Sequence, residues 1–144
     1  MSNFHYLTRG VILKDGKVLV VKAIGADNTF LPGGHIEIGE RAKDALKREI
    51  KEEINQDAIV KEHLGAIEHS WAENGTNNFE INLVFKVEVP KLSVLEPPVS
   101  CESHLQFIWL KPNELESHNL KPAPLIELIK NMSVNTKSFW GSTL

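Results

Sequence analysis

Residues 33–56 read GGHIEIGERAKDALKREIKEEINQ, and this stretch determines how the rest of the chain is interpreted. Residues 41–54 contain no glycine or proline and are rich in Ala, Leu, Lys and Glu, which predicts a helix. At about 100° per residue, one broad side of this helix is apolar and carries Ala42, Ala45, Leu46, Ile50 and Ile54. Glu49 and Glu53 fall within that side, and Glu52 falls at its edge. Because burying an unpaired charge is unfavourable, a helix that only packed on a core would not carry carboxylates there.

The three glutamates are spaced so that their carboxylates project side by side along about one helical turn. Like charges that close repel and raise one another's pKa unless a cation neutralises them. Sites made only of oxygen ligands suit Mg²⁺ or Mn²⁺. The alternative is a solvated Glu/Lys face, a common helix surface stabilised by pairs four residues apart. The apolar-side position of Glu49 and Glu53 disfavours that alternative.

The same stretch resembles the Nudix box, the signature of a family of hydrolases. Gly34 is followed by five residues and Glu40, then by seven residues and Arg48-Glu49-Ile50-Lys51-Glu52-Glu53. The preceding Leu31-Pro32-Gly33-Gly34 is similar to the lead-in that the family usually has. The resemblance extends to the strands before the box, to residues 80–85 and to the ending around residues 109–115. It therefore covers most of residues 4–115.

Two positions depart from the box. Asn55 stands where the family has glycine, and Gln56 stands where it has an aliphatic residue. The glycine would end the helix in a left-handed conformation, for which asparagine is the next-best residue. We therefore expect the metal site to be retained, and only the packing of the following loop to differ.

The resemblance implies a Mg²⁺-dependent (or Mn²⁺-dependent) hydrolase. Such an enzyme would use water to cleave the pyrophosphate linkage of a nucleoside diphosphate joined to another moiety, as in an NTP, a nucleotide sugar such as ADP-ribose, or a dinucleotide. The implied metal ligands are Glu49, Glu52, Glu53 and the Gly33 carbonyl, and the implied supporting residues are Glu40, Arg48 and Gly34. Arg48 and Glu40 resemble a pair in which a guanidinium holds a carboxylate by two hydrogen bonds.

The implied catalytic residues are Glu52, Glu53 and Glu102. Two of them, Glu53 and Glu102, are the candidates for the general base. Some relatives use a glutamate of the box and others an acid from a later loop. Glu53 is the first choice and Glu102, in the loop Ser100-Cys101-Glu102-Ser103-His104, is the second. The alternative for Glu102 is an exposed loop acid, because loops carry charge more often than they carry function.

The remaining elements predict an α/β (α+β) fold. Strands are expected at 4–13, 18–23, 58–64, 66–72, 79–89 and 106–110, a short extended piece at 29–31, a turn at 74–78 and a helix at 124–132. Asp15-Gly16 predicts a hairpin. Strands around a central helix favour a layered sandwich, and the resemblance implies a Nudix-type α/β/α sandwich with a mixed central sheet. Residues 1–144 would form one domain, with the box at 34–56 and a tail at 133–144 that has no counterpart.

Other residues that could carry chemistry give weaker signals. Cys101 is the single cysteine, and no triad accompanies it. The six histidines never occur at zinc-ligand spacing, and the glycines near residue 34 lack the Gly-Lys-Ser/Thr ending of a phosphate loop. Four aromatic residues could stack on a base, although packing is the commoner role: Phe30, Trp71, Phe79 and Trp140.

Composition sets the broad class. The chain has 144 residues, 42% hydrophobic and 24% charged, with a net charge of −3. This charge does not favour nucleic acid, and no apolar run reaches the length of a membrane span. We therefore expect a cytoplasmic protein with a small-molecule partner, and a homodimer if it self-associates. The rival hypothesis is a non-catalytic Nudix-like module that binds a nucleotide or metabolite and regulates a partner.

Overall fold

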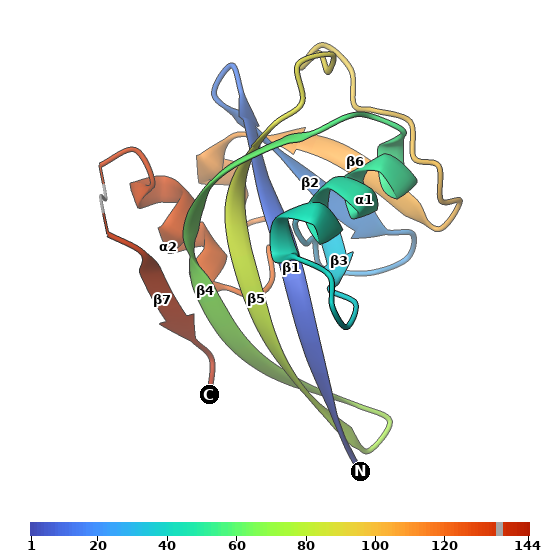
Figure 1. Cartoon of the computed structure of the whole chain (residues 1–144), viewed down its shortest axis with the longest axis vertical. Coiled ribbons are helices and arrows are strands. Elements are labelled where there is room, and N and C mark those ends of the chain that lie inside the picture. The colour runs from blue at the N-terminus through green and yellow to red at the C-terminus, as the bar shows by residue number, and fades with distance from the viewer. Residues whose placement is uncertain (135–136) are drawn as a thin grey trace.

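A computed structural model describes residues 1–134 and 137–144, and these form a seven-stranded mixed sheet with two α-helices (Figure 1). The strands run in the order β6-β2-β1-β5-β4-β7, and β3 pairs with β1 beside this path. The β1–β5 and β4–β7 pairs are parallel and the others are antiparallel. The elements are β1 (Ser2–Lys14), β2 (Lys17–Ala23), β3 (Gly33–His35), α1 (Ala42–Ile54), β4 (Ile59–Glu73), β5 (Thr76–Glu88), β6 (Leu105–Leu110), a 3-10 turn (Pro112–Glu114), α2 (Pro124–Asn131) and β7 (Phe139–Ser142).

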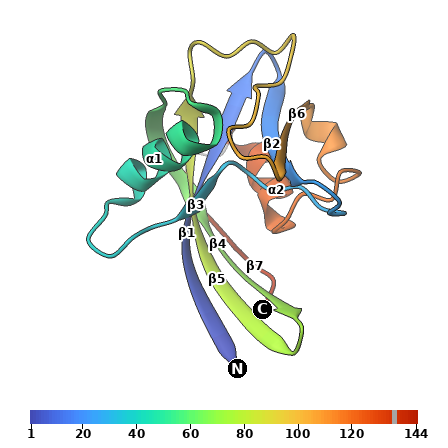
Figure 2. The same cartoon turned by 90° about the vertical axis from the view of Figure 1, so that its right-hand side faces the viewer.

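The two helices lie on opposite sides of the strands (Figure 2). Alternation along the strands produces two apolar cores, because successive side chains point to opposite faces. Val11 packs in the core that contains Leu125 and Leu128 of α2, whereas Ile12 packs in the core that contains Leu46 and Ile50 of α1. The predicted α/β/α sandwich with a mixed sheet is therefore confirmed.

The strand predictions are confirmed in outline and wrong at several boundaries. Residues 58–64 and 66–72 form one strand, β4, in which register shifts relative to β5 occur between Val60 and Gly65. The predicted turn at 74–78 is shorter, because only Asn74 and Gly75 adopt positive φ and pairing resumes at Thr76. Asn-Gly is the dipeptide that a two-residue hairpin favours. The Asp15-Gly16 hairpin is present, with φ of 48° and 76°.

The Gly33-Gly34 dipeptide, for which no strand was predicted, is paired as β3 against Leu7–Arg9 of β1. Gly33 has φ 142°, and an added Cβ would lie 2.0 Å from the Thr8 carbonyl oxygen. Only glycine therefore permits this close pairing. The pairing brings the segment that precedes the box to the middle of β1.

The tail, which had no predicted structure, contributes β7. This strand pairs with residues 65–68 of β4. An added Cβ at Gly65 would lie 2.3 Å from the Phe139 carbonyl oxygen, so glycine is needed where β7 docks. The apolar alternation in the tail is too short to predict this strand. Residues 135 and 136 lie outside the described part of the tail.

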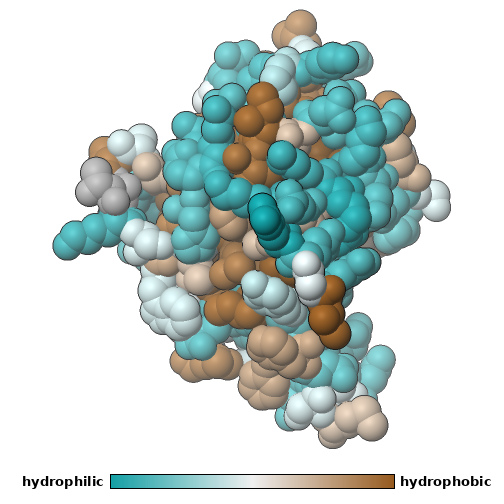
Figure 3. Space-filling model, in the orientation of Figure 1, coloured by the Kyte–Doolittle hydropathy of each residue, from teal (hydrophilic) through white to brown (hydrophobic). Residues whose placement is uncertain are grey.

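The lower parts of β1, β4 and β5 extend beyond the helices as a ribbon (Figures 1 and 2). On the face that α1 only partly covers, apolar side chains gather below the helix (Figure 3). Phe4 and Phe79 are directly paired there, with exposed fractions of 71% and 39%. Tyr6 and Ile81 form the next pair on that face. None of the helices in residues 1–134 and 137–144 is long and apolar enough to cross a membrane.

Candidate active site

The end of α1 places two of the predicted glutamates toward the interior. Glu53 is buried, with 4% of its surface exposed, and Glu49 is partly buried. The helix ends at Asn55, which adopts the left-handed conformation (φ 53°, ψ 40°) and donates its backbone N–H to the Lys51 carbonyl. This confirms that asparagine substitutes for the expected glycine at the helix end.

Glu53 is held against β3. One carboxylate oxygen, Oε1, accepts a hydrogen bond from the Gly33 backbone N–H at 3.3 Å, and the other, Oε2, is buried without a hydrogen-bond partner among the described residues. Burial raises the pKa of Glu53 to about 8, and the nearby charges of Glu49 and Glu102 add to the rise. The Gly33 N–H and Arg9 oppose it. When protonated, this carboxyl group has no acceptor for its O–H among the described residues. When ionised, it has no cation beside Oε2.

Gly34 makes room for Glu49. An added Cβ at Gly34 would lie 2.5 Å from the Glu49 carboxyl carbon and within 2.7 Å of both carboxylate oxygens. Burial raises the pKa of Glu49, and the Arg48 guanidinium partly opposes this rise. The fixed glycine of the box therefore allows a carboxylate to lie directly beside the backbone that precedes the helix.

Arg48 organises the polar side of the site. Its Nε and Nη2 donate to the two carboxylate oxygens of Glu40 at 2.8 and 2.9 Å, and Nη2 also donates to the His35 carbonyl at 3.0 Å. Nη1 donates to Glu49 at 3.0 Å and to Glu52 at 3.3 Å. The two-bond contact with Arg48 lowers the pKa of Glu40 to about 2, and the Glu37 backbone N–H contributes. The predicted Arg48–Glu40 pair is present in this structure.

The residues fit a divalent cation in part. The partnerless Oε2 of Glu53 and the adjacent Glu49 carboxylate offer the hard oxygen ligands that Mg²⁺ prefers. The Glu52 carboxylate is instead exposed and is held toward Arg48. Within the described residues, no three His, Cys, Asp or Glu side chains converge closely enough to hold a metal ion. The ligand roles of Glu49, Glu52, Glu53 and the Gly33 carbonyl therefore all stay predictions.

Glu102 lies at the same cavity as the box glutamates. The Cys101 backbone N–H donates to the Glu53 carbonyl at 2.7 Å, which fixes the loop against the end of α1. The Glu102 carboxylate is partly exposed and lies 3.6 Å from His104. A cavity of about 430 Å³ is lined by Glu49, Glu53, Glu102, Gly33 and Gly34. The structure thus brings together five of the predicted site residues.

Sequence reasoning missed Arg9 and Glu80, which line this cavity together with Phe30 and Trp71. Phe30 and Trp71 were predicted to pack rather than to face a ligand, and both line the cavity. Alternation could have found Arg9, because it shares a strand face with the buried Val11. A charged residue in such a register is unusual.

A second cavity of about 570 Å³ adjoins the first, and Arg9, Phe30, Trp71 and Glu80 line both. Its remaining wall is polar and includes Asp27, Asn28, His69, Glu73, Asn82, Asn119 and Lys121. The two cavities together form a cleft that runs from the carboxylates to the loop before α2.

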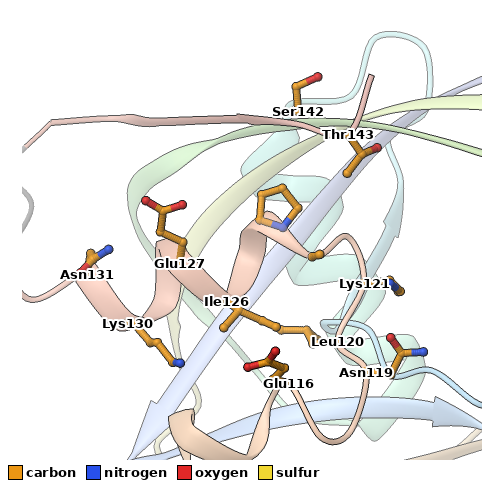
Figure 4. A pocket seen from close by; sticks show the side chains of 12 residues that line it. Glu116, Asn119, Leu120, Lys121, Ile126, Glu127, Lys130, Asn131, Ser142 and Thr143 are labelled. Carbon is orange, nitrogen blue, oxygen red and sulfur yellow. The ribbon is translucent and has the colours of Figure 1, made fainter.

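A larger groove of about 820 Å³ lies on the other side of that loop, between α2 and the end of β7 (Figure 4). Glu127 and Lys130 of α2 and Glu116 of the preceding loop project around it, and it shares Asn119 and Lys121 with the second cavity. The box glutamates do not line it. We therefore place the chemistry in the cleft.

Comparison with known proteins agrees with this geometry. The NUDIX domain family model matches residues 5–130. An ADP-ribose pyrophosphatase of Methanocaldococcus jannaschii is 38% identical over 85 residues, which are 56% of this chain but only 48% of that protein. The nucleoside triphosphatase NudI of Escherichia fergusonii is 28% identical over 123 residues, covering 78% of this chain and 86% of that protein. A MutT Nudix hydrolase from Burkholderia pseudomallei has a similar fold, with a TM-score of 0.65 at 24% identity over 88% of this chain and 96% of that one.

The chain is an α/β/α sandwich in which a mixed sheet lies between two helices. A Glu–Arg network lies at a cleft beside the first helix. Since the family model covers most of its length, the chain is a member of the NUDIX domain family, the Nudix hydrolases. The resemblance of residues 34–56 to the Nudix box is therefore confirmed.

Proposed function

We propose that this protein is a Mg²⁺-dependent hydrolase that cleaves the pyrophosphate linkage of a nucleoside diphosphate joined to another moiety. The observation that carries the proposal is the buried Glu53 carboxylate with one oxygen unpartnered, placed beside Glu49 at a cleft. The names of the relatives support a substrate of this kind, since they include an ADP-ribose pyrophosphatase and a nucleoside triphosphatase. The pyrophosphate would lie in the cavity of the glutamates.

The box residues would have two roles, binding the metal ion and holding its ligands in place. When bound, Mg²⁺ supplies positive charge at the transferred phosphoryl group and lowers the pKa of its bound water. Glu49 and Glu53 would hold it, with Glu52 completing the set on release from Arg48. The Arg48–Glu40 pair would keep α1 and the preceding loop in one arrangement, because it joins Glu40, the His35 carbonyl and Glu49 through one guanidinium.

Glu102 and Glu53 remain the two candidates for the base that takes a proton from water. Glu53 keeps its own proton at neutral pH while no cation is near, because its pKa is about 8. A carboxyl group in that state accepts no further proton. Glu102 is more exposed than Glu53 and lines the same cavity. With Mg²⁺ bound, Glu53 would be ionised as a ligand, so Glu53 stays the first candidate for the base and Glu102 the second.

The rival hypothesis is a module that binds a nucleotide and regulates a partner without catalysis. Such a module gains nothing from a buried carboxyl group with an unpartnered oxygen, because this arrangement costs stability. The test is a pooled panel of NTPs, nucleotide sugars and dinucleotides, with release of phosphate or nucleotide measured with Mg²⁺ and with EDTA. Mg²⁺-dependent release supports the enzyme, and binding of a panel member without turnover supports the module.

A further inference from the structure

Arg9 lies at the junction of the two cavities of the cleft. It is one of the few residues that line both, whereas Glu49 and Glu53 line only the first. On β1 it is directly opposite Gly33 of β3, the residue whose backbone N–H is bonded to Glu53. The register of the sheet therefore fixes a guanidinium next to the carboxylates on which the proposed function depends.

The hydrogen-bonding capacity of Arg9 is only partly used. A guanidinium has five N–H donors. Nη1 donates to the Leu31 carbonyl at 3.0 Å, and Nε makes a long contact of 3.5 Å with Asn82 Oδ1. The guanidinium carbon also lies 5.5 Å from the centre of the Phe30 ring. Among the described residues no carboxylate forms an ion pair with Arg9, so its Nη2 donors have no protein acceptor.

The cleft around Arg9 is acidic. Four carboxylates line the first cavity, those of Glu49, Glu53, Glu80 and Glu102, and Arg9 is the one permanently charged cation among its described lining residues. A pyrophosphate that enters the cavity is therefore repelled by the ionised carboxylates there and attracted by Arg9. Because the chain has a net charge of −3, the surrounding protein does not offset this repulsion.

We propose that Arg9 binds the substrate phosphate that lies between the carboxylates and the second cavity, and thereby positions the pyrophosphate linkage at the glutamates. This inference rests on the proposed function. A planar guanidinium with free donors on both Nη1 and Nη2 fits two oxygens of one phosphate, which a lysine cannot match. The second cavity, with Trp71 and Asn119 on its walls, would then receive the nucleoside. The alternative is a structural cation that only offsets Glu80 and Glu53.

The test uses inorganic pyrophosphate as a probe, because it requires no knowledge of the nucleoside. Binding is measured by calorimetry in the presence of Mg²⁺ for the wild type, Arg9→Met and Arg9→Lys. The matched control is Arg41→Met, which makes the same change at an exposed arginine outside the cleft. We expect Arg9→Met to weaken binding by roughly tenfold or more and Arg9→Lys by roughly threefold or more, as loss of charge-assisted hydrogen bonds predicts. The control should stay within about twofold.

Unchanged pyrophosphate affinity in Arg9→Met, or no binding by the wild type, overturns the inference. Where Arg9→Met does not fold, Arg9→Lys decides, because a purely structural cation predicts wild-type affinity for it. The substrate panel separates the two proposals. Arg9-dependent binding without any hydrolysis refutes the proposed function alone. Hydrolysis of a panel substrate by Arg9→Met with kcat and KM both within about threefold of wild type refutes the role of Arg9 alone.

Discussion

Replacing Glu53 by glutamine should stabilise the metal-free protein while abolishing most activity. The sign follows from linkage. Glu53 has a pKa of about 8 in the folded protein and 4.5 as its reference value, so the unfolded chain loses this proton first as pH rises. The free energy of unfolding therefore falls as pH rises from about 4.5 to about 8. Glutamine removes this dependence and can keep the hydrogen bond from the Gly33 N–H.

The magnitude follows from the same two values. At pH 7 the folded protein still holds the proton that the unfolded chain released near pH 4.5, which costs about 3 kcal/mol at about 1.4 kcal/mol per pH unit. The glutamine amide N–H₂ has no acceptor there, as Oε2 has none now, so the net gain should be about 1–3 kcal/mol. That corresponds to an increase in Tm of roughly 3–10 °C.

The assay is thermal unfolding in EDTA at pH 5.5, 7 and 8, with Glu62→Gln as a control at an exposed position. The advantage of Glu53→Gln should grow with pH, and the control should show none. With Mg²⁺ the wild type should gain more stability than the variant, because the ion binds the folded state. The variant's kcat should fall by roughly 10³-fold or more. A stability advantage that does not widen between pH 5.5 and 8 would refute the desolvation argument.

Four further results are expected. Asn55→Gly should be neutral or stabilising and Asn55→Val should cost about 1–2 kcal/mol, because Asn55 has φ 53°; equal urea midpoints for the Asn and Val forms would contradict this. Gly34→Ala should lower kcat by roughly tenfold or more by displacing the Glu49 carboxylate, and wild-type kinetics in this variant would show that Glu49 is not needed where it lies. Activity should require Mg²⁺ or Mn²⁺ and be poor with Ca²⁺, so full turnover in excess EDTA would be the contrary result. Light scattering should give a homodimer that Phe4→Ser dissociates, because Phe4 lies in the exposed apolar patch that also contains Phe79. A monomeric wild type would show that this patch is not a dimer interface.

The sequence predicted the box region well because its information is local. The inward position of Glu49 and Glu53 follows from helical periodicity, and the left-handed Asn55 follows from the chemistry of helix ends. The Arg48–Glu40 contact spans only eight residues, and its fixed spacing made it recognisable. Local geometry therefore fixed the residues that the helix itself carries.

The residues that sequence reasoning missed depend on pairing between distant strands. Alternation along β1 can mark Arg9 as unusual, but its place at the cleft depends on the pairing of β1 with β3 and β5, and no local pattern specifies that register. β3 itself is three residues long, too short for periodicity to show. The second cavity combines Asp27, Trp71 and Lys121, which only the folded sheet and the loop before α2 bring together. Such a wall cannot be derived from spacing along one segment.

The docking of β7 has a consequence for how this protein behaves at high concentration. Without β7, residues 65–68 of β4 would expose unpaired N–H and C=O groups at the margin of the sheet, which can template pairing with a second chain. The four residues of β7 thus protect the middle of β4 from intermolecular β-addition. Recombinant versions shortened before Phe139 should precipitate more readily than the full chain, even though none of the described residues that line the cleft belongs to the missing piece.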